Sequence, residues 1–124
     1  MRDENMITEI AFTGVPVTDM KKARDFYEGT LGLKPAMESG GGMWVEYEIG
    51  PATFALGCYG DAWKPSADGT CVAFEVDNFD SEVARLKSRN IKFDLEATES
   101  PVCRFAIVFD PDGNKVMIHK RKAQ

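Results

Sequence analysis

Hydrophobic and polar positions alternate in several short segments of this chain, each bounded by Gly, Pro, Asn or Asp. In one of them, Val72, Phe74 and Val76 alternate with Ala73 and Glu75, which is the period of two expected of a strand with one buried face. The segments MWVEYEI, ATFALGCY and KVMIH show the same period, and CRFAIVF is a short, mostly apolar segment. Each of these segments predicts a strand.

Two other segments have the three-to-four-residue spacing of amphipathic helices. The first begins after Asp19 and ends at Gly29 and Gly32, and the second begins after Asn78; Asp and Asn are favoured N-cap residues. The expected apolar faces are Met20, Ala23, Phe26 and Tyr27 in the first helix, and Phe79, Val83 and Leu86 in the second.

Residues 6–17, LKPAMES and IKFDLEATE are also interpreted as strands, so the order strand, helix, three strands occurs twice. The segment Val15-x-Val17-Thr-Asp19-Met20 matches Phe74-x-Val76-Asp-Asn78-Phe79 at an offset of 59 residues, which indicates a duplicated unit. We predict a single α+β domain over residues 1–124, with a first βαβββ module at 6–60, a linker at 61–69 and a second module at 70–119. The triplet Gly40 to Gly42 lacks the Lys-Ser/Thr of a phosphate-binding loop and is interpreted as a hairpin turn.

A second turn signal lies near the C-terminus, where Asp110-Pro111-Asp112-Gly113-Asn114 separates the apolar segments FAIVF and KVMIH. Five turn-forming residues between two strands predict a β-hairpin.

Three segments together resemble the vicinal oxygen chelate superfamily, which comprises glyoxalases, bleomycin resistance proteins and dioxygenases. They are Val15-x-Val17-x-Asp19 leading into ARDFYEGTLGL, the mid-chain VAFEVDNFD, and DPDGN. The resemblance spans residues 7–119 and implies two curved mixed sheets around a ligand cleft. It also implies a homodimer, with modules that pair within a chain or by exchange between chains.

In that family the helices cover the convex faces of the sheets and the ligand lies against the concave faces. Strand alternation then identifies the side chains that face the cleft, and the family spacing before Asp19 adds Phe12. The candidate ligand-binding residues are Phe12, Trp44, Glu46, Glu48, Tyr59, Cys71, Glu75, Arg104, Met117 and His119. Arg104 is included, together with Lys115, as an available partner for the carboxylates.

The resemblance places the four usual metal-ligand positions at Phe12, Ala55, Cys71 and Met117. Divalent ions in such sites need several nitrogen or oxygen donors. Phe and Ala offer no donor, Met is a weak soft one, and the chain has one His. We therefore expect no metal ligands and no cofactor.

Each candidate also has a plainer interpretation. The aromatic residues Phe12, Trp44, Tyr59 and Trp63 form either a wall for a planar or cationic guest or part of a core or dimer interface. The weak catalytic candidates are Glu75, Glu46 and His119, as proton shuttles. Glu46 and Glu48 are otherwise solvated residues on an exposed stretch, His119 is a solvated strand end, and Cys71 is a small packing residue.

Charge and cysteine content exclude several classes of partner. The net charge of −5 and the pI of about 4.9 argue against nucleic acid and anionic membrane surfaces. No apolar run reaches the length of a signal peptide or a membrane span. Three cysteines without metal-site spacing suggest reduced thiols and a cytoplasmic protein.

These features lead to a first hypothesis: a metal-free protein that binds a small aromatic or cationic molecule in the cleft between paired modules. Whether the chain is an enzyme is left open. The alternative is a glyoxalase-type lyase or isomerase, or a dioxygenase-related enzyme, with atypical catalytic residues. A third possibility is a regulatory domain that binds partners through its outer surface.

Overall fold

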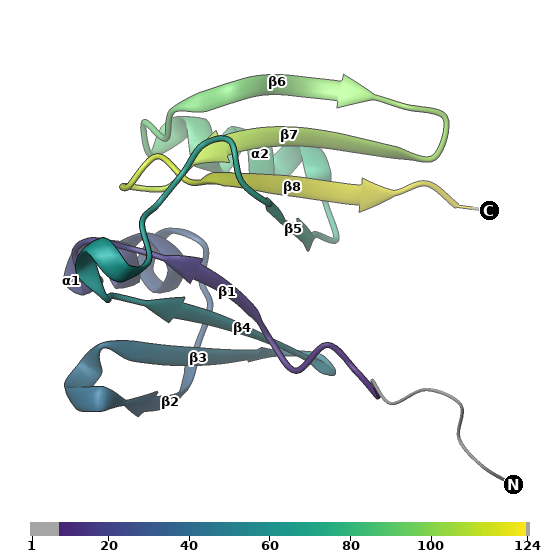
Figure 1. Cartoon of the computed structure of the whole chain (residues 1–124). Helices are drawn as coiled ribbons and strands as arrows, with labels where there is room; N and C mark the ends of the chain where they lie inside the picture. Colours follow the sequence, from purple (N-terminus) through teal and green to yellow (C-terminus); the bar gives the residue numbers. More distant parts are fainter. Residues whose placement is uncertain (1–7, 124) are drawn as a thin grey trace, which may run out of the picture.

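The computed structural model describes residues 8–123, and these form two four-stranded sheets, one from each half of the chain (Figure 1). The first sheet has the order β1-β4-β3-β2 and the second β5-β8-β7-β6. The strands of the first sheet are β1 (Thr13–Pro16), β2 (Pro35–Ser39), β3 (Trp44–Ile49) and β4 (Ala52–Gly57). Those of the second are β5 (Val72–Glu75), β6 (Phe93–Glu99), β7 (Cys103–Phe109) and β8 (Lys115–Arg121).

Both sheets are built in the same way, which agrees with the predicted α+β fold of two βαβββ units. In each, the first strand pairs in parallel with the last strand, and the other pairs are antiparallel. A helical segment follows each first strand, because a parallel pair needs a crossover connection.

The predicted caps start both helices. The Asp19 side chain accepts a hydrogen bond from Lys22 N at the start of α1 (Met20–Arg24), and Asn78 accepts one from Ser81 N at the start of α2 (Phe79–Ser88). Helix α1 continues into the π-helical segment η1 (Asp25–Thr30). Gly32 follows at φ 80°, a left-handed conformation that suits glycine at a helix end.

Two short 3₁₀ turns connect other elements. The glycine triplet forms η2 (Gly40–Gly42) between β2 and β3, so it is a hairpin connection as expected, and η3 (Gly60–Ala62) follows β4.

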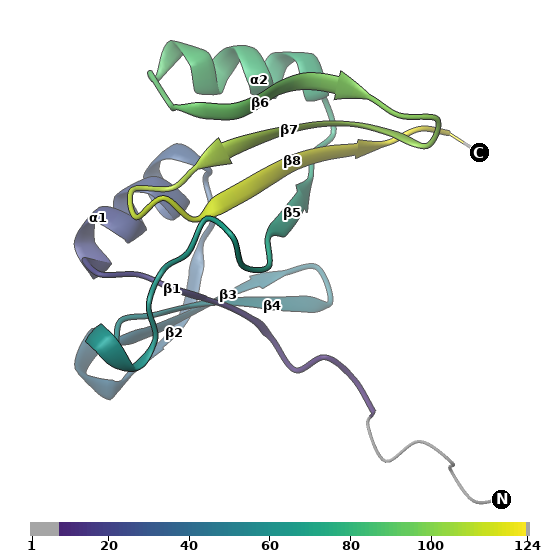
Figure 2. The ribbon, with the colours of Figure 1, turned by 45° about the horizontal axis from the view of Figure 1, so that its top comes forward.

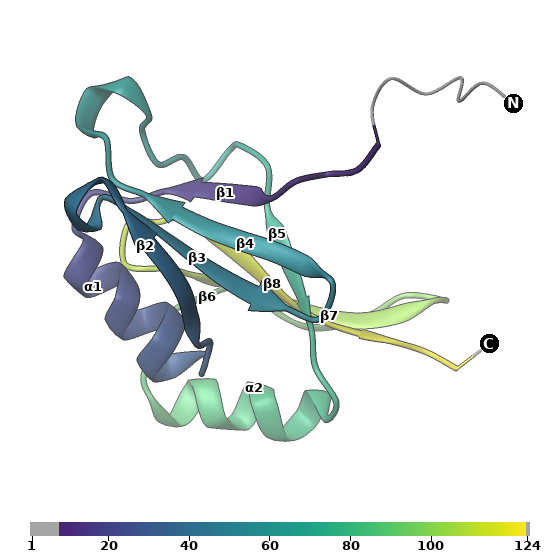
Figure 3. The same ribbon diagram turned by 90° about the horizontal axis from the view of Figure 1, so that it is seen from below.

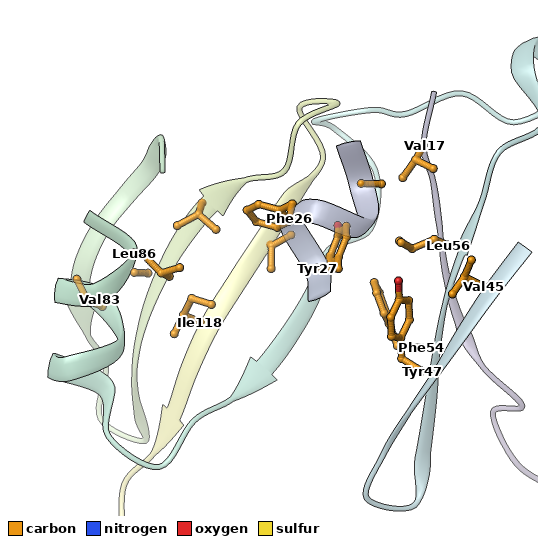
Figure 4. Close-up of a cluster of buried hydrophobic side chains, with 14 of the residues drawn as sticks. Val17, Phe26, Tyr27, Val45, Tyr47, Phe54, Leu56, Val83, Leu86 and Ile118 are labelled. Carbon is orange, nitrogen blue, oxygen red and sulfur yellow. The ribbon is translucent and has the colours of Figure 1, made fainter. Parts of the chain in front are cut away.

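In Figure 3 the two helices lie next to each other along one edge of the view, and their apolar faces contribute to one shared core. The fully buried side chains include Tyr27 of η1, Tyr47 of β3, Leu56 of β4, Leu86 of α2 and Ile118 of β8 (Figure 4). The two halves meet at Phe54 and Phe74, whose ring centroids are 5.2 Å apart in an edge-to-face arrangement.

We call the face of each sheet that carries these buried side chains its helix face, and the opposite face its open face. The two sheets are steeply inclined to each other: in Figure 2 the strands of the second sheet are spread across the view, while those of the first overlap. Because the helix faces meet in one core, the two open faces point outward in different directions.

The DPDGN turn fastens the second half of the chain to the first. Asp110, which is 5% exposed, accepts hydrogen bonds from the hydroxyl of Tyr27 (2.8 Å) and from the backbone N–H of Asp112 and of Asn114 (2.9 Å each). The Asn114 amide donates to Asp110 and to the carbonyl of Pro16, both at 2.9 Å. A buried carboxylate needs such a complete set of donors, so the turn fixes how the two halves are arranged.

No helix within residues 8–123 is long and apolar enough to cross a membrane.

Candidate functional site

Four aromatic side chains lie together on the open face of the first sheet. Trp44 is at the centre: its ring centroid lies 5.1 Å from that of Phe12, edge to face, and 6.5 Å from those of Tyr59 and Trp63. The interplanar angle with Trp63 is 24°, so these two rings are nearly parallel. We call Phe12, Trp44, Tyr59 and Trp63 the aromatic platform. The structure thus brings together the four aromatic residues that the sequence suggested as a wall.

Two glycines make room for the Trp63 ring. A Cβ added to Gly57 would lie 2.6 Å from Cζ3 of Trp63, and one added to Gly14 would lie 2.9 Å from its Cη2. Real Cβ atoms essentially never come this close to another atom. Trp63 comes from the loop after η3, and it packs against the sheet only because β1 and β4 lack side chains at these two positions.

A carboxylate is held at the platform. Trp44 Nε1 donates a 2.8 Å hydrogen bond to Oε2 of Glu46, two residues along β3. The indole therefore fixes a negative charge beside the aromatic rings. Glu48, the next residue on this face, is exposed and accepts a 2.7 Å hydrogen bond from Thr53 Oγ1.

The open face of the second sheet carries a pair of titratable groups. His119 Nδ1 lies 2.6 Å from Oε1 of Glu75, and Oε2 of Glu75 accepts a 2.8 Å hydrogen bond from the backbone N–H of Arg121. That backbone donor, followed by His119, lowers the pKa of Glu75. The carboxylate therefore stays ionised at neutral pH.

Apolar side chains surround this pair. β7 places Phe105 directly opposite His119 and Ile107 opposite Met117, while β5 places Ala73 beside Met117 on its other side. Phe105, Ile107 and Met117 are half-buried. Cys71 precedes β5, and burial raises the pKa of its thiol, which disfavours the reactive thiolate.

The predicted pairing of Arg104 and Lys115 with the carboxylates of the open faces is wrong. Arg104 lies on the helix face, with its guanidinium 4.7 Å from the Phe79 ring centroid and a 2.8 Å ion pair to Asp80. Lys115 pairs with Asp94 at 3.3 Å. Arg104 alternates with Ala106 and Val108, whose buried side chains lie on the helix face, so strand alternation places it toward α2.

The pairing of Glu75 with His119 was not foreseen either, although the sequence contains the signal. β5 is the first strand of the second module and β8 is its last. Their parallel pairing puts Glu75 directly beside His119. Phe105 and Ile107 were not proposed as site residues, but they occupy the alternate positions of CRFAIVF that face away from α2.

The four positions at which the family resemblance predicts metal ligands offer a poor donor set. Phe12 packs against Trp44, Ala55 is fully buried, and Cys71 and Met117 carry only sulfur. Within residues 8–123, no three His, Cys, Asp or Glu side chains are grouped closely enough to hold a metal ion. These residues do not fit a hard divalent cation.

The platform and the Glu75–His119 pair lie on different open faces, so one chain does not bring them together around a guest. A hollow of about 580 Å³ lies between the two halves. Helix-face residues such as Leu33, Phe54 and Ile118 line it, and its lining also includes Glu75 and Arg121. A smaller hollow of about 150 Å³ lies beside Trp63 and Pro16.

Comparison with known proteins identifies the type of chain. The family model described as Glyoxalase/Bleomycin resistance protein/Dioxygenase superfamily matches residues 9–118. No curated protein matches the sequence significantly.

Solved structures share the fold over nearly the full length. TnmS3, an antibiotic binding protein from Streptomyces sp. CB03234, is 25% identical with a TM-score of 0.79, covering 96% of this chain and 100% of its own. A glyoxalase/bleomycin resistance protein from the same organism is 27% identical with a TM-score of 0.72, covering 89% and 98%. A lactoylglutathione lyase from Agrobacterium tumefaciens, 19% identical with a TM-score of 0.72, covers 94% and 96% and shows similarity of fold alone.

Proposed function

Since this chain belongs to the Glyoxalase/Bleomycin resistance protein/Dioxygenase superfamily, we propose that it binds a small aromatic or cationic molecule without using a metal ion. The guest lies in a cleft formed jointly by two copies of the chain. One wall is the aromatic platform of one copy, and the other is the open face of the second sheet of its partner.

The aromatic platform is the observation that carries this proposal. Phe12 and Tyr59 are 46% and 39% exposed, although large aromatic side chains are normally buried or paired at an interface. Parallel rings such as Trp44 and Trp63 offer a flat surface for stacking, and an anchored carboxylate, Glu46, favours a positive charge on the guest. The antibiotic binding protein TnmS3 shares 25% of its residues with this chain, which is consistent with a guest of small-molecule size.

The absence of suitable donors supports binding without a metal. Phe12, Ala55, Cys71 and Met117 provide no oxygen or nitrogen at the positions where relatives place ligands. Sequestration of a guest needs stacking and charge complementarity, and both are supplied by side chains of this chain.

The direction of the open faces supports a homodimer. The two faces point outward in different directions and expose apolar side chains, so a cleft between paired modules requires a second copy. The three free cysteines suit a reducing compartment such as the cytoplasm.

Binding is tested with proflavine, a planar aromatic cation, and 9-anthracenecarboxylate, a planar aromatic anion, by tryptophan fluorescence and thermal shift. We expect proflavine to bind and to raise the melting temperature, and Trp44→Ala to weaken binding at least about tenfold through lost stacking. Ile49→Ala is the matched control, because Ile49 lies on the same strand but on the helix face.

Two results would contradict the proposal. One is equal binding by wild type and Trp44→Ala, which would remove the platform from the site. The other is near-stoichiometric nickel, zinc, manganese or iron in the purified protein, which would refute binding without a metal.

A second candidate function is a glyoxalase-type lyase or isomerase with atypical residues, which the Glu75–His119 hydrogen bond favours. Saturable turnover of the methylglyoxal–glutathione adduct, together with no response to either aromatic probe, would support it over the binding function.

A further inference from the structure

We propose that Glu75 and His119 form a metal-independent proton-transfer site, in which Nε2 of His119 is the base and Glu75 positions it. The substrate class is a carbon acid: a planar molecule with an acidic C–H next to an electron-withdrawing group. The inference rests on the proposed cleft for substrate binding, but its chemistry depends on the second sheet alone.

The carboxylate of Glu75 is fixed at both oxygens. Oε1 lies 2.6 Å from His119 Nδ1, and Oε2 is held at 2.8 Å by the backbone N–H of Arg121. A carboxylate only accepts, so the short contact requires the proton on Nδ1. In the neutral ring this tautomer places the lone pair on Nε2, which is the form that a general base needs.

The sheet keeps the pair in place. Glu75 and His119 are register partners in the parallel pair of β5 and β8, and Phe105 faces His119 across β7. The imidazole therefore lies between a carboxylate and an aromatic side chain on a central strand. Groups carried on strands are held more precisely than groups on loops.

The degree of burial suits a base that must meet a substrate. The side chain of His119 is 23% exposed and that of Glu75 is 38% exposed, so the pair is partly shielded but accessible. The other charged groups on this face are Arg121, whose guanidinium lies 4.0 Å from Glu75 Oε1, and Lys115, which is paired with Asp94. Neither competes with His119 for a substrate proton, because both are cations.

The reaction needs no oxidant, reductant or co-reactant. Nε2 takes the proton, and the C–H electron pair moves into the adjacent electron-withdrawing group. Glu75 stabilises the imidazolium that forms. The proton then returns to a neighbouring carbon of the substrate, which completes an isomerisation, or it passes to water.

The probe for this activity is 5-nitrobenzisoxazole, a planar aromatic carbon acid. Removal of its ring C–H proton converts the C–H electron pair into a nitrile bond, and the N–O bond breaks with its electrons on the phenolate oxygen. The coloured phenolate reports each turnover, and the imidazolium loses its proton to water. We expect the wild-type dimer to convert the probe and His119→Gln to lose about 100-fold in rate, the lower range for a positioned base.

Further variants distinguish the role of His119 as the base from the role of Glu75 as the positioning residue. His119→Ala should recover turnover on addition of imidazole. Glu75→Gln should retain partial activity, because the base remains while the carboxylate that positions it becomes a neutral amide. Glu96→Gln is the matched control, since Glu96 is an exposed carboxylate of the same sheet that pairs with Lys87.

Turnover that is equal in wild type and His119→Gln, or no faster than with free imidazole at the same concentration, would overturn the inference. Proflavine binding that depends on Trp44, without probe turnover, would reject the proton-transfer site while supporting the binding function. Turnover that depends on His119, without proflavine binding, would support the site and contradict the proposed guest.

Discussion

Among single residues, the acidic side chains of the open faces show how differently the same group is held. Glu46 accepts from an indole N–H, Glu48 from a threonine hydroxyl, and Glu75 from an imidazole and a backbone N–H. All three face away from the helices on regular strands. The local partner, rather than position in the strand, therefore decides what each carboxylate can do.

The first prediction concerns Glu75 and pH. Its pKa is lowered in the folded protein, so its contribution to stability is present above the usual glutamate range and is lost as the pH falls through the lowered value. The group is exposed, so we expect this contribution to be below about 1 kcal/mol.

This contribution is tested by urea unfolding of wild type and Glu75→Gln from about pH 6 to pH 3, which spans the ordinary pKa range of glutamate. The variant should be less stable near pH 6 and should converge with wild type at low pH. Glu96→Gln serves again as the control, and a constant difference between wild type and Glu75→Gln across the range would refute the linkage.

At the scale of elements, β1, β4 and the loop after η3 together hold Trp63 in the aromatic platform. The loop lies outside the sheet, yet Trp63 packs over Gly14 and Gly57 and against Trp44. The platform is therefore an assembly of two strands and a loop. A side chain at either glycine position would occupy the space of the indole.

We expect Gly57→Ala to displace the Trp63 ring, because the added methyl group would lie 2.6 Å from it. The free energy of unfolding should fall by about 1 kcal/mol, as for other small overpacking changes, and proflavine binding should weaken. Tryptophan fluorescence and urea unfolding measure these effects. Gly69→Ala is the control, since its new Cβ would meet no atom closer than 3.9 Å; an equal response of both variants would contradict this packing role.

At the scale of the whole molecule, the shared core decides where the open faces point. Phe54 and Phe74 meet between the halves, and the DPDGN turn binds Tyr27 and Pro16 of the first half. This arrangement directs the aromatic platform and the Glu75–His119 pair to different sides of the chain. A guest that touches both must lie between two copies.

Mixing two variants, each impaired in a different wall of the cleft, tests that arrangement at a probe concentration well below saturation. Trp44→Ala removes the platform and His119→Gln removes the base, so a mixed dimer regains one intact cleft from the unaffected halves. After random exchange of subunits, we expect about a quarter of wild-type probe turnover. Sedimentation should show a dimer, and turnover that stays at the level of the separate variants would place the complete site within one chain.

The sequence alone determined the order of elements, the helix caps, the duplicated unit and the buried face of most strands. These are local properties: alternation in Val45, Tyr47, Phe54 and Leu56 follows from strand geometry, and capping by Asp19 and Asn78 follows from unpaired N–H groups at helix starts. Alternation also placed Trp44 and Tyr59 on the open face, and the family spacing added Phe12. Trp63 lies in a loop, where there is no period to follow.

Only the tertiary structure decided the contacts between segments far apart in the sequence. It placed Arg104 against α2, paired Glu75 with His119 and turned the two open faces away from each other. Strand pairing, twist and the packing angle of two halves depend on many side chains at once. A pattern along the chain identifies the two faces of each sheet. It does not determine how the two sheets are oriented relative to each other when they share one core.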